Sequence, residues 1–246
     1  MNKPQKTTVF AIRIKASTEE GSNHRTIREP LIKRWFDIAL SSIGLIGSSW
    51  LFTLFSIMII IEDGFPVLIR QGRIGKGGRI FKSIKFRSMI KDALKEKVSV
   101  QANENDARIT RSGRFLRKGA MDELPQLINI LNGDMSFVGP RALLPLEIEI
   151  NSTPRVLHVS DLPGYEERVK VRPGLTGIAQ IYAPRDLKRR HKFKYDILYT
   201  RKLSLWTDLK LIFLSFIISS HGTWERRGAK LSSLKRGKDG PLRGRD

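Results

Sequence analysis

The 246-residue sequence contains no cysteine and only four histidines, and these absences exclude several classes of protein. Without cysteine there is no disulfide framework, no thiolate metal site and no catalytic thiol. The histidines lack the four-residue spacing that places two ligands on one face of a helix, so a zinc enzyme is not expected. The length suits one sizeable domain, or one domain with a membrane segment and flexible ends.

Acidic residues are scarce relative to basic ones. The sequence has 24 Asp and Glu residues against 45 Lys and Arg residues, which gives a net charge of +21. This excess favours polyanionic partners such as phospholipid surfaces, nucleic acid or phosphorylated substrates. The charge alone does not choose among them.

Charged residues are absent from Ile38 to Ile61, and so is proline. A helix of this length reaches roughly 36 Å, enough to cross the hydrocarbon core of a bilayer. Basic residues lie on both sides of the segment, and the positive-inside tendency then places both ends in the cytoplasm. We therefore predict that residues 31–63 form a re-entrant helix, which enters and leaves through one leaflet. We favour this form over a helix that simply spans the bilayer. Small residues between Ser41 and Ser49 permit the bend.

The remaining segments differ in composition. Residues 1–30 form a basic arm without the early apolar core of a secretory signal, and residues 225–246 form a basic tail. Both are expected to be flexible because they have too few apolar residues to build a core. Residues 64–224 predict a mixed α/β domain, in which β-branched runs at 66–69 and 79–86 indicate strands.

A helix is predicted over residues 203–218, because its apolar side chains recur at spacings that favour one face. Asp208 and Lys210 lie outside that face. The helix either rests on a membrane surface, with Trp206 at the level of the headgroups, or packs in the core of the domain. The sequence leaves both interpretations open.

The sharpest local signal is the sequence Asp-Glu-Leu-Pro-Gln-Leu at 122–127. Proline is tolerated in the first turn of a helix, so a helix is predicted to begin near Asp122 and to end at Gly133. Asp122 and Glu123 form either a plain helix cap or a catalytic pair with separated pKa values, one carboxylate staying ionised as nucleophile while the other handles a proton. The predicted buried face of this helix consists of Leu124, Leu127, Ile128 and Leu131.

Basic side chains flank the acidic pair on both sides. An anionic pair among guanidinium groups suits a site where a diphosphate is held while a carboxylate attacks it or holds a metal ion. A glycine-rich basic cluster at 70–79 precedes Lys-Phe-Arg-Ser-Met at 85–89, and Arg-Pro-Gly-Leu-Thr-Gly at 172–177 is either a phosphate cap or a tight loop. The candidate phosphate-binding residues are Lys85, Arg87, Arg108, Arg117, Arg141 and Arg172.

Taken in order, these motifs resemble the bacterial sugar transferase family, the monotopic phosphoglycosyl transferases that act on polyprenyl phosphate. Lys-Arg-Trp-Phe-Asp-Ile at 33–38 and Asp-Ala-Arg-Ile-Thr at 106–110 belong to the match, which extends over about 33–224. The resemblance implies that 64–224 is a catalytic α/β domain with interfacial amphipathic helices. One N-terminal re-entrant helix would anchor it on the cytoplasmic face of the bacterial inner membrane.

The resemblance also implies a two-step reaction. Asp122 would attack the β-phosphate of a UDP-sugar and release UMP, and polyprenyl (undecaprenyl) phosphate would then take the phosphosugar from the aspartate. Glu123 would assist proton transfer, Mg²⁺ would bind beside Asp122, and Arg117 would hold phosphate. The implied partners are the UDP-sugar, the lipid phosphate and the bilayer, and assembly into a homo-oligomer is left open. The product would begin a polysaccharide or glycoconjugate.

The sequence departs from the family pattern in several places. Ser48-Ser49-Trp50 stands where members usually have Ser-Pro, Ala120 stands in place of a serine, and Ala142 in place of a proline. None of these changes removes a carboxylate. The segment 183–186 differs from the Gly-Arg sequence of relatives that use simple hexoses, which leaves the sugar open.

Two other classes of function compete with this one. A nucleic-acid-binding protein would explain the net charge but neither the uncharged segment nor the acidic pair, so nucleic acid is not an expected partner. A membrane scaffold without catalysis would have no need of Asp122, Glu123 and Arg117.

Overall fold

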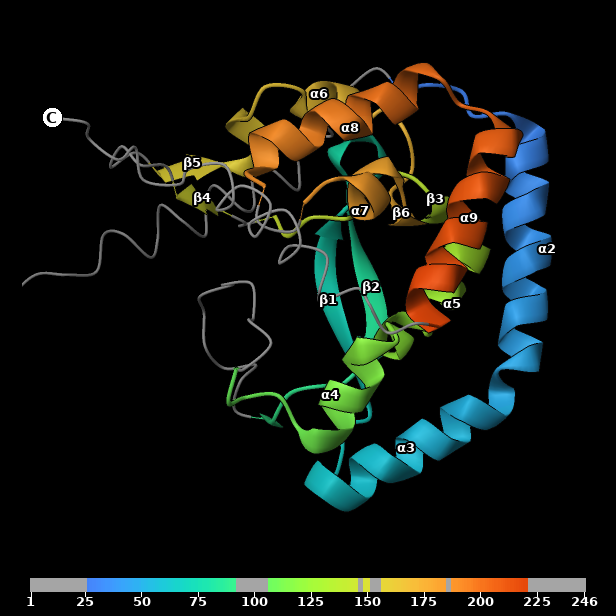
Figure 1. Cartoon of the computed structure of the whole chain (residues 1–246), viewed down its shortest axis with the longest axis vertical. Coiled ribbons are helices and arrows are strands. Elements are labelled where there is room, and N and C mark those ends of the chain that lie inside the picture. Colours follow the sequence, from blue (N-terminus) through green and yellow to red (C-terminus); the bar gives the residue numbers. More distant parts are fainter. Residues whose placement is uncertain (1–25, 92–105, 146–147, 151–155, 185–186, 221–246) are drawn as a thin grey trace, which may run out of the picture.

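The computed structural model describes residues 26–91, 106–145, 148–150, 156–184 and 187–220. Most of the predicted basic arm and the whole tail at 225–246 lie outside these residues. Figure 1 shows a bent pair of helices along one side of a mixed domain of helices and short strands. The predicted mixture of helix and strand is confirmed.

The apolar segment forms two helices, α2 (Leu31–Gly47) and α3 (Ser49–Asp63), which meet at Ser48 at an angle of 58°. The Ser48 hydroxyl donates a hydrogen bond to the Gly44 carbonyl at 2.6 Å, and such bonds from serine bend helices without proline. Among the described helices none is long and apolar enough to span a membrane alone, whereas this bent pair reaches that length and composition together. The bend predicted among small residues is confirmed.

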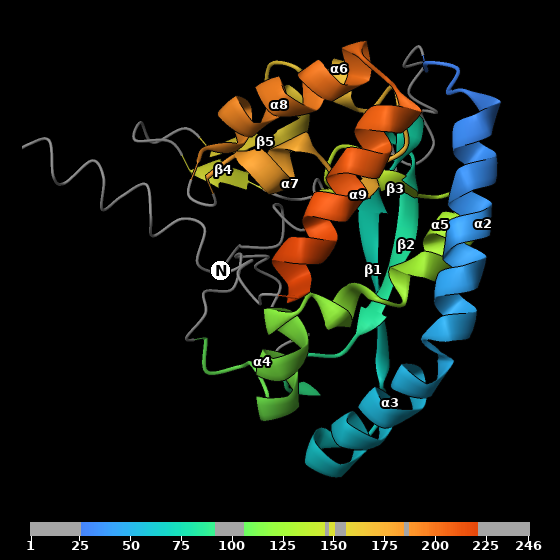
Figure 2. The same ribbon diagram turned by 45° about the vertical axis from the view of Figure 1, so that its right-hand side comes forward.

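Helix α2 runs along one side of the domain (Figures 1 and 2). It turns its polar side inward and its apolar side outward. Lys33 and Asp37 are 4 % and 0 % exposed, whereas Trp35 and Ile46 are 70 % and 77 % exposed. A water-soluble helix shows the opposite pattern, because burying a charge is costly and burying an apolar side chain is favourable. The outer face of α2 is therefore suited to an apolar surrounding.

The inward charges of α2 are paired with the domain. Lys33 Nζ lies 2.6 Å from a carboxylate oxygen of Asp208, and Asp37 lies 3.2 Å from the guanidinium of Arg172. Arg34 donates hydrogen bonds of 2.7 Å to two carbonyls at the end of the helix that follows the acidic pair, those of Ile130 and Leu131. These contacts fix α2 against the domain.

Strands form near both predicted positions and make a hairpin, but the first lies over 68–74 and not over 66–69. β1 (Leu68–Ile74) and β2 (Ile80–Phe86) pair antiparallel, with Ile69 opposite Lys85. The turn between them contains η1 (Lys76–Gly78), a single 3₁₀ turn in which Gly77 has φ 68°. Side chains alternate along a strand, so this register decides which basic residues share a face.

The acidic pair lies between two helices. Helix α4 (Arg111–Lys118) is followed by the 3₁₀ turn η3 (Met121–Glu123) and then by α5 (Gln126–Asn132). The prediction of one helix from Asp122 is wrong in this respect, because α5 begins only after Pro125. Gly133 ends α5 at φ 92°, as predicted.

The predicted buried face of this helix is only partly right. Leu127 is buried, whereas Leu124, Ile128 and Leu131 are half-buried, and the other buried positions are Ile130 and two amides. One of these amides, Asn129, closes the outer edge of β2: its Oδ1 accepts from the Ile84 amide at 2.9 Å and its Nδ2 donates to the Lys82 carbonyl at 2.8 Å. The polar inward side chains shift the apolar face away from the predicted one.

Two further short strands pair in parallel, β3 (Ser136–Val138) and β6 (Gly174–Thr176). A Cβ at Gly174 would meet the backbone of Gly139, so this close approach requires glycine. The remaining elements are β4 (Ile148–Ile150), β5 (Val156–His158), η4 (Val159–Asp161), α6 (Tyr165–Arg168), α7 (Ile178–Tyr182), α8 (Arg189–Arg201) and α9 (Leu205–Ser220).

Helix α9 is the helix predicted over 203–218, and its apolar stripe faces outward. Trp206, Phe213 and Phe216 are 77 %, 64 % and 72 % exposed. Asp208 lies off this stripe, as predicted, but it is buried on the inner side, where Leu211 joins the core. The exposed stripe favours the membrane-surface interpretation over a helix of the core.

Candidate active site

Asp122 and Glu123 lie on the turn η3, which is reached through a sharp change of backbone direction. Ala120 adopts a left-handed conformation with φ 57°, the one non-glycine residue of the described chain to do so. Such a conformation costs a non-glycine residue about 1 kcal/mol, and residues held this way are concentrated at functional sites. Backbone hydrogen bonds of 3.2 Å from Glu123 to Ala120 and from Leu124 to Met121 then close the turn.

Positive side chains from three other segments approach this turn. Lys85 comes from β2, Arg117 from the last turn of α4, and Arg141 from the segment after β3. Arg141 lies 3.4 Å from a carboxylate oxygen of Glu123. The acidic pair is thus held among basic groups, as the sequence predicts.

The electrostatic setting of Asp122 is unusual for a carboxylate. Burial, and after it the negative charge of Glu123, raises the pKa of Asp122 to about 6, although the positive charges of Lys85 and Arg117 act in the opposite direction. Burial and the neighbouring charge of Arg73 lower the pKa of Lys85. A carboxylate with a raised pKa is more basic than usual, and it is still mostly ionised at neutral pH, as a nucleophile must be.

The structure brings together five of the predicted site residues. Asp122, Glu123, Lys85, Arg117 and Arg141 form this acidic and basic corner, which we call the Asp122 corner. None of the described residues forms an ion pair with the Asp122 carboxylate, so its two oxygens are not committed to a guanidinium or ammonium group of the protein.

Three predicted phosphate-binding residues are engaged elsewhere. Arg87 forms an ion pair of 3.0 Å with Asp63 at the end of α3. Arg108 pairs with Asp106 at 2.7 Å, and Arg172 pairs with Glu29 at 3.0 Å. Their binding of phosphate stays a prediction, because each guanidinium already has a carboxylate of the protein as its partner.

The element at 172–177 is not a tight loop, and its role as a phosphate cap stays a prediction. It contains strand β6, and the Thr176 hydroxyl is hydrogen-bonded to that of Ser215 on α9. Arg172, at its start, also reaches Asp37 on α2. This element therefore holds α2 and α9 against the domain.

Arg73 is a basic residue beside the Asp122 corner that is not among the candidates from the sequence. It donates hydrogen bonds to the Ala142 carbonyl at 3.0 Å and to the Gln71 side chain at 2.7 Å, and its charge acts on Lys85. The signal was present in the alternation of β1 and β2, which puts Arg73 and Lys85 on one face. Using it required the register of the hairpin, which the turn sequence did not reveal.

The description of the matching family model is bacterial sugar transferase, and it covers residues 28–221. This chain belongs to that family. It is 42 % identical over 190 residues to a UDP-glucose:undecaprenyl-phosphate glucose-1-phosphate transferase of Klebsiella pneumoniae, and 40 % identical over 190 residues to the protein of that name from Escherichia coli (strain K12). Each match covers 75 % of this chain and 39 % of the relative, so the chain spans about two fifths of their length.

A shorter relative is matched along most of its own length. The exopolysaccharide production protein ExoY of Rhizobium meliloti (strain 1021) is 34 % identical over 197 residues, which cover 74 % of this chain and 83 % of the relative. The bent helix pair and the Asp122 corner both lie inside the region that the family model matches.

The oxygen ligands of this sugar transferase suit magnesium only in part. Across the described ranges, no group of three or more acidic or histidine side chains is placed to hold a metal ion. Mg²⁺ is commonly held by one or two carboxylates together with substrate phosphates and water. The Asp122 carboxylate, which forms no ion pair with a described residue, is an oxygen donor of the kind that this pattern requires.

Proposed function

We propose that this sugar transferase moves a sugar 1-phosphate from a UDP-sugar to undecaprenyl phosphate and releases UMP, as the initiating membrane step of polysaccharide or glycoconjugate assembly. The observation that carries the proposal is the uncommitted Asp122 carboxylate, with a pKa raised to about 6, beside Lys85 and Arg117. Two relatives are named for this reaction with UDP-glucose as donor.

In the first step a carboxylate oxygen of Asp122 bonds to the β-phosphorus of the donor. The bond from that phosphorus to the oxygen bridging the two phosphates breaks, and UMP leaves with that oxygen. Asp122 then carries the phosphosugar as an acyl phosphate. The charges of Lys85 and Arg117 act on Asp122, and in this scheme they stabilise the oxygens that gain negative charge as the bridge breaks.

In the second step an oxygen of undecaprenyl phosphate bonds to the same phosphorus. The bond to the Asp122 oxygen breaks, which restores the carboxylate and gives the undecaprenyl diphosphate sugar. In this scheme Glu123, which adjoins Asp122 and lies 3.4 Å from Arg141, takes the proton of the incoming phosphate. Asp122 would hold Mg²⁺, which when bound would supply positive charge against the phosphate oxygens.

The helices that expose apolar side chains support an anchor in the inner membrane with the catalytic domain on its cytoplasmic face. The outer face of α2 and the stripe of α9 both present tryptophan, at Trp35 and Trp206, and the amphipathic indole ring favours the level of the headgroups. The 58° bend at Ser48 suits a helix that returns to the same leaflet.

This topology is tested with single cysteines, which the natural chain lacks. Cysteines placed at Lys6 and at Ser232 should both react with a reagent applied from the cytoplasmic side of inverted vesicles. Labelling of the two positions from opposite sides would establish a helix that spans the bilayer.

The reaction is tested by UMP release from purified protein in detergent, with undecaprenyl phosphate, magnesium and a panel of UDP-sugars. We expect repeated release of UMP with at least one donor, and only when the lipid phosphate is present in excess over the protein. Asp122→Asn should release no UMP. Silence of the folded wild-type protein across a broad panel would favour a scaffold without catalysis.

A further inference from the structure

The end of helix α3 touches the two elements that carry the Asp122 corner. Glu62, in the last turn of α3, accepts hydrogen bonds from the first two backbone amides of α4, those of Arg111 at 2.6 Å and Ser112 at 2.8 Å. Both amides lack acceptors within their own helix. Burial alone would raise the pKa of Glu62, but the bonds from Ser112 and Arg111 outweigh it, and the pKa is lowered. The carboxylate is therefore a stable link between α3 and α4.

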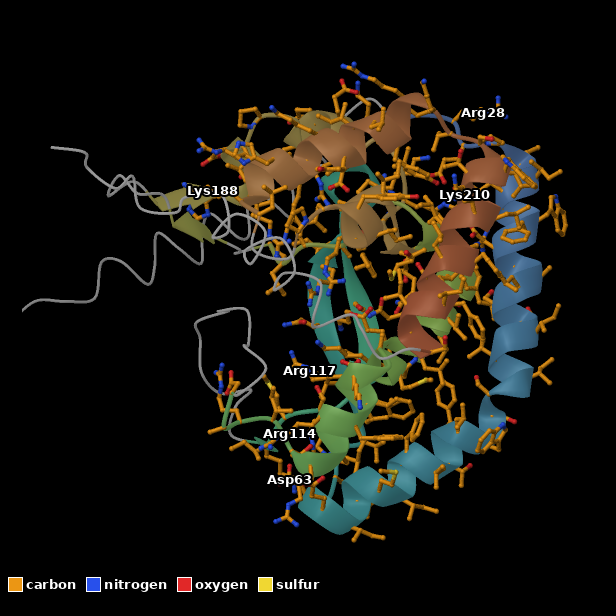
Figure 3. The ribbon with its side chains drawn as sticks, viewed as in Figure 1. Arg28, Asp63, Arg114, Arg117, Lys188 and Lys210 are labelled. Carbon is orange, nitrogen blue, oxygen red and sulfur yellow. The ribbon has the colours of Figure 1, made fainter. Side chains whose placement is uncertain are left out.

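A second link runs from the same end of α3 to β2. Arg87 directly follows β2 and is 1 % exposed. It donates hydrogen bonds to the backbone carbonyls of Asp63 at 2.9 Å and Gly64 at 2.6 Å, and pairs with the Asp63 carboxylate at 3.0 Å. Figure 3 shows Asp63 at the end of α3, beside α4. A buried arginine binding the last carbonyls of a helix holds that helix end rigidly.

The two links lead by short paths to the reacting groups. Arg87 lies two residues after Lys85, so the clamp on α3 also sets the end of β2. Helix α4 ends at Lys118, and Asp122 follows after the left-handed residue Ala120. Apolar side chains fill the space between the three elements, and they are Phe55 and Ile59 of α3, Phe86 of β2 and Leu116 of α4.

We propose that Glu62 and Arg87 are positioning residues, through which insertion of the α2–α3 pair in a bilayer sets the separation of Asp122 and Lys85. The inference rests on the proposed function, since it concerns the same corner. Helix α3 exposes Leu54, Ile57 and Ile61, so its outer face is suited to the apolar interior of a bilayer. A displacement of about 1 Å at a reacting group can lower the rate on the order of 100-fold.

The chain offers a matched pair of variants. Glu62→Ala removes an acceptor that α3 supplies to the start of α4, whereas Thr110→Ala removes an acceptor that α4 supplies to itself, the Thr110 hydroxyl bound to the Gly113 amide at 3.0 Å. Both changes weaken the same helix end, but only the first cuts the link to α3. Both proteins should fold, because Glu62 is exposed and α4 keeps one of its two caps.

For the wild type and both variants, kcat, the KM for the donor and the melting temperature are measured in nanodiscs of phosphatidylethanolamine and phosphatidylglycerol. The same quantities are then measured in detergent. In nanodiscs we expect Glu62→Ala to lower kcat about tenfold with KM within about twofold, while Thr110→Ala lowers the melting temperature similarly and keeps kcat within about twofold. If the bilayer sets the corner, kcat of the wild type and of Thr110→Ala should be higher in nanodiscs than in detergent, and this difference should disappear in Glu62→Ala. Equal kcat for the two variants in nanodiscs would overturn the inference.

Hydrogen exchange separates this inference from the reaction itself. In nanodiscs, the amides of Glu123 and Leu124, which close the turn η3, should exchange about tenfold faster in Glu62→Ala than in the wild type. In Thr110→Ala their exchange rates should equal those of the wild type. An inactive wild-type protein with this exchange pattern would defeat the proposed function and keep the link. An active wild-type protein whose Glu62→Ala variant shows unchanged exchange would defeat the link alone.

Discussion

The buried face of α2 and the Asp122 corner are both rich in charge, yet they use it differently. On α2 the charges are matched at close range, as in the pair of Lys33 and Asp208 at 2.6 Å, which also receives a hydrogen bond of 2.8 Å from the Tyr199 hydroxyl. At the corner the Asp122 carboxylate has no such partner among the described residues, and its pKa is raised to about 6.

This difference teaches that the state of pairing, and not the presence of charge, separates a structural network from a reactive one. A paired buried charge is stable because its partner replaces the lost water. An unpaired carboxylate in a basic setting is instead kept ready for a ligand that carries its own charge. Changes in the two regions should therefore affect different measurements, activity in the corner and stability on α2.

The largest effect should follow from Asp122→Asn. An amide cannot act as the nucleophile, and loss of a nucleophile costs about 10³-fold or more in rate. Wild-type protein given a donor labelled in its β-phosphate, without acceptor, should retain label after denaturation, and the variant should not. Retention of label by the variant would assign the nucleophile to another residue.

The next effect is one of stability, on α2. Lys33→Met leaves Asp208 buried without its partner and should lower the free energy of unfolding by about 3–5 kcal/mol. The double variant Lys33→Met/Asp208→Leu should recover most of that loss. Denaturant unfolding in detergent measures both, and transfer per folded molecule should stay near that of the wild type. A neutral single variant would show that the pair is not structural.

A smaller effect on activity should separate two arginines of α4, which Figure 3 labels. Arg117 is half-buried and acts on Asp122, whereas Arg114 is exposed. Arg117→Ala should weaken transfer roughly 10–100-fold by loosening the hold on phosphate. Arg114→Ala changes the net charge equally and serves as the control. Similar losses in both would point to a general effect of charge.

The smallest effect concerns pH. Because the pKa of Asp122 is raised from 3.8 to about 6, the folded state binds a proton more tightly than the unfolded state, and stability falls as pH rises between these values. At pH 8 the free energy of unfolding of Asp122→Asn should therefore exceed that of the wild type by up to about 3 kcal/mol, and this advantage should vanish below pH 3.8. Wild-type transfer should decline as pH falls through about 6.

Local patterns predicted the elements of the fold that depend on neighbouring residues. The hairpin strands, the stop at Gly133 and the bend among small residues each follow from a few adjacent side chains. The start of α5 did not, because Pro125 permits both a helix from Asp122 and the separate turn that Ala120 makes. A left-handed alanine carries no sequence signal of its own.

The site was predictable where the residues adjoin and not where they meet through the fold. Asp122, Glu123 and Arg117 lie within seven positions of one another, and a motif suffices to join them. The motifs around Arg87 and Arg172 suggest that both residues bind an anion. Their partners, Asp63 and Glu29, lie far from them in the sequence and belong to no recognisable motif. Long-range pairing of this kind is set by packing, which sequence spacing does not record.

The side chain of Asn129 has a consequence for the solubility of the domain. A two-stranded hairpin leaves an open edge, which can add a strand from another molecule and begin aggregation. By bonding the Ile84 amide and the Lys82 carbonyl, the carboxamide of Asn129 occupies the edge of β2 as a single residue of a third strand would. One amide on a helix thus protects the strand that carries Lys85 from being recruited into an intermolecular sheet.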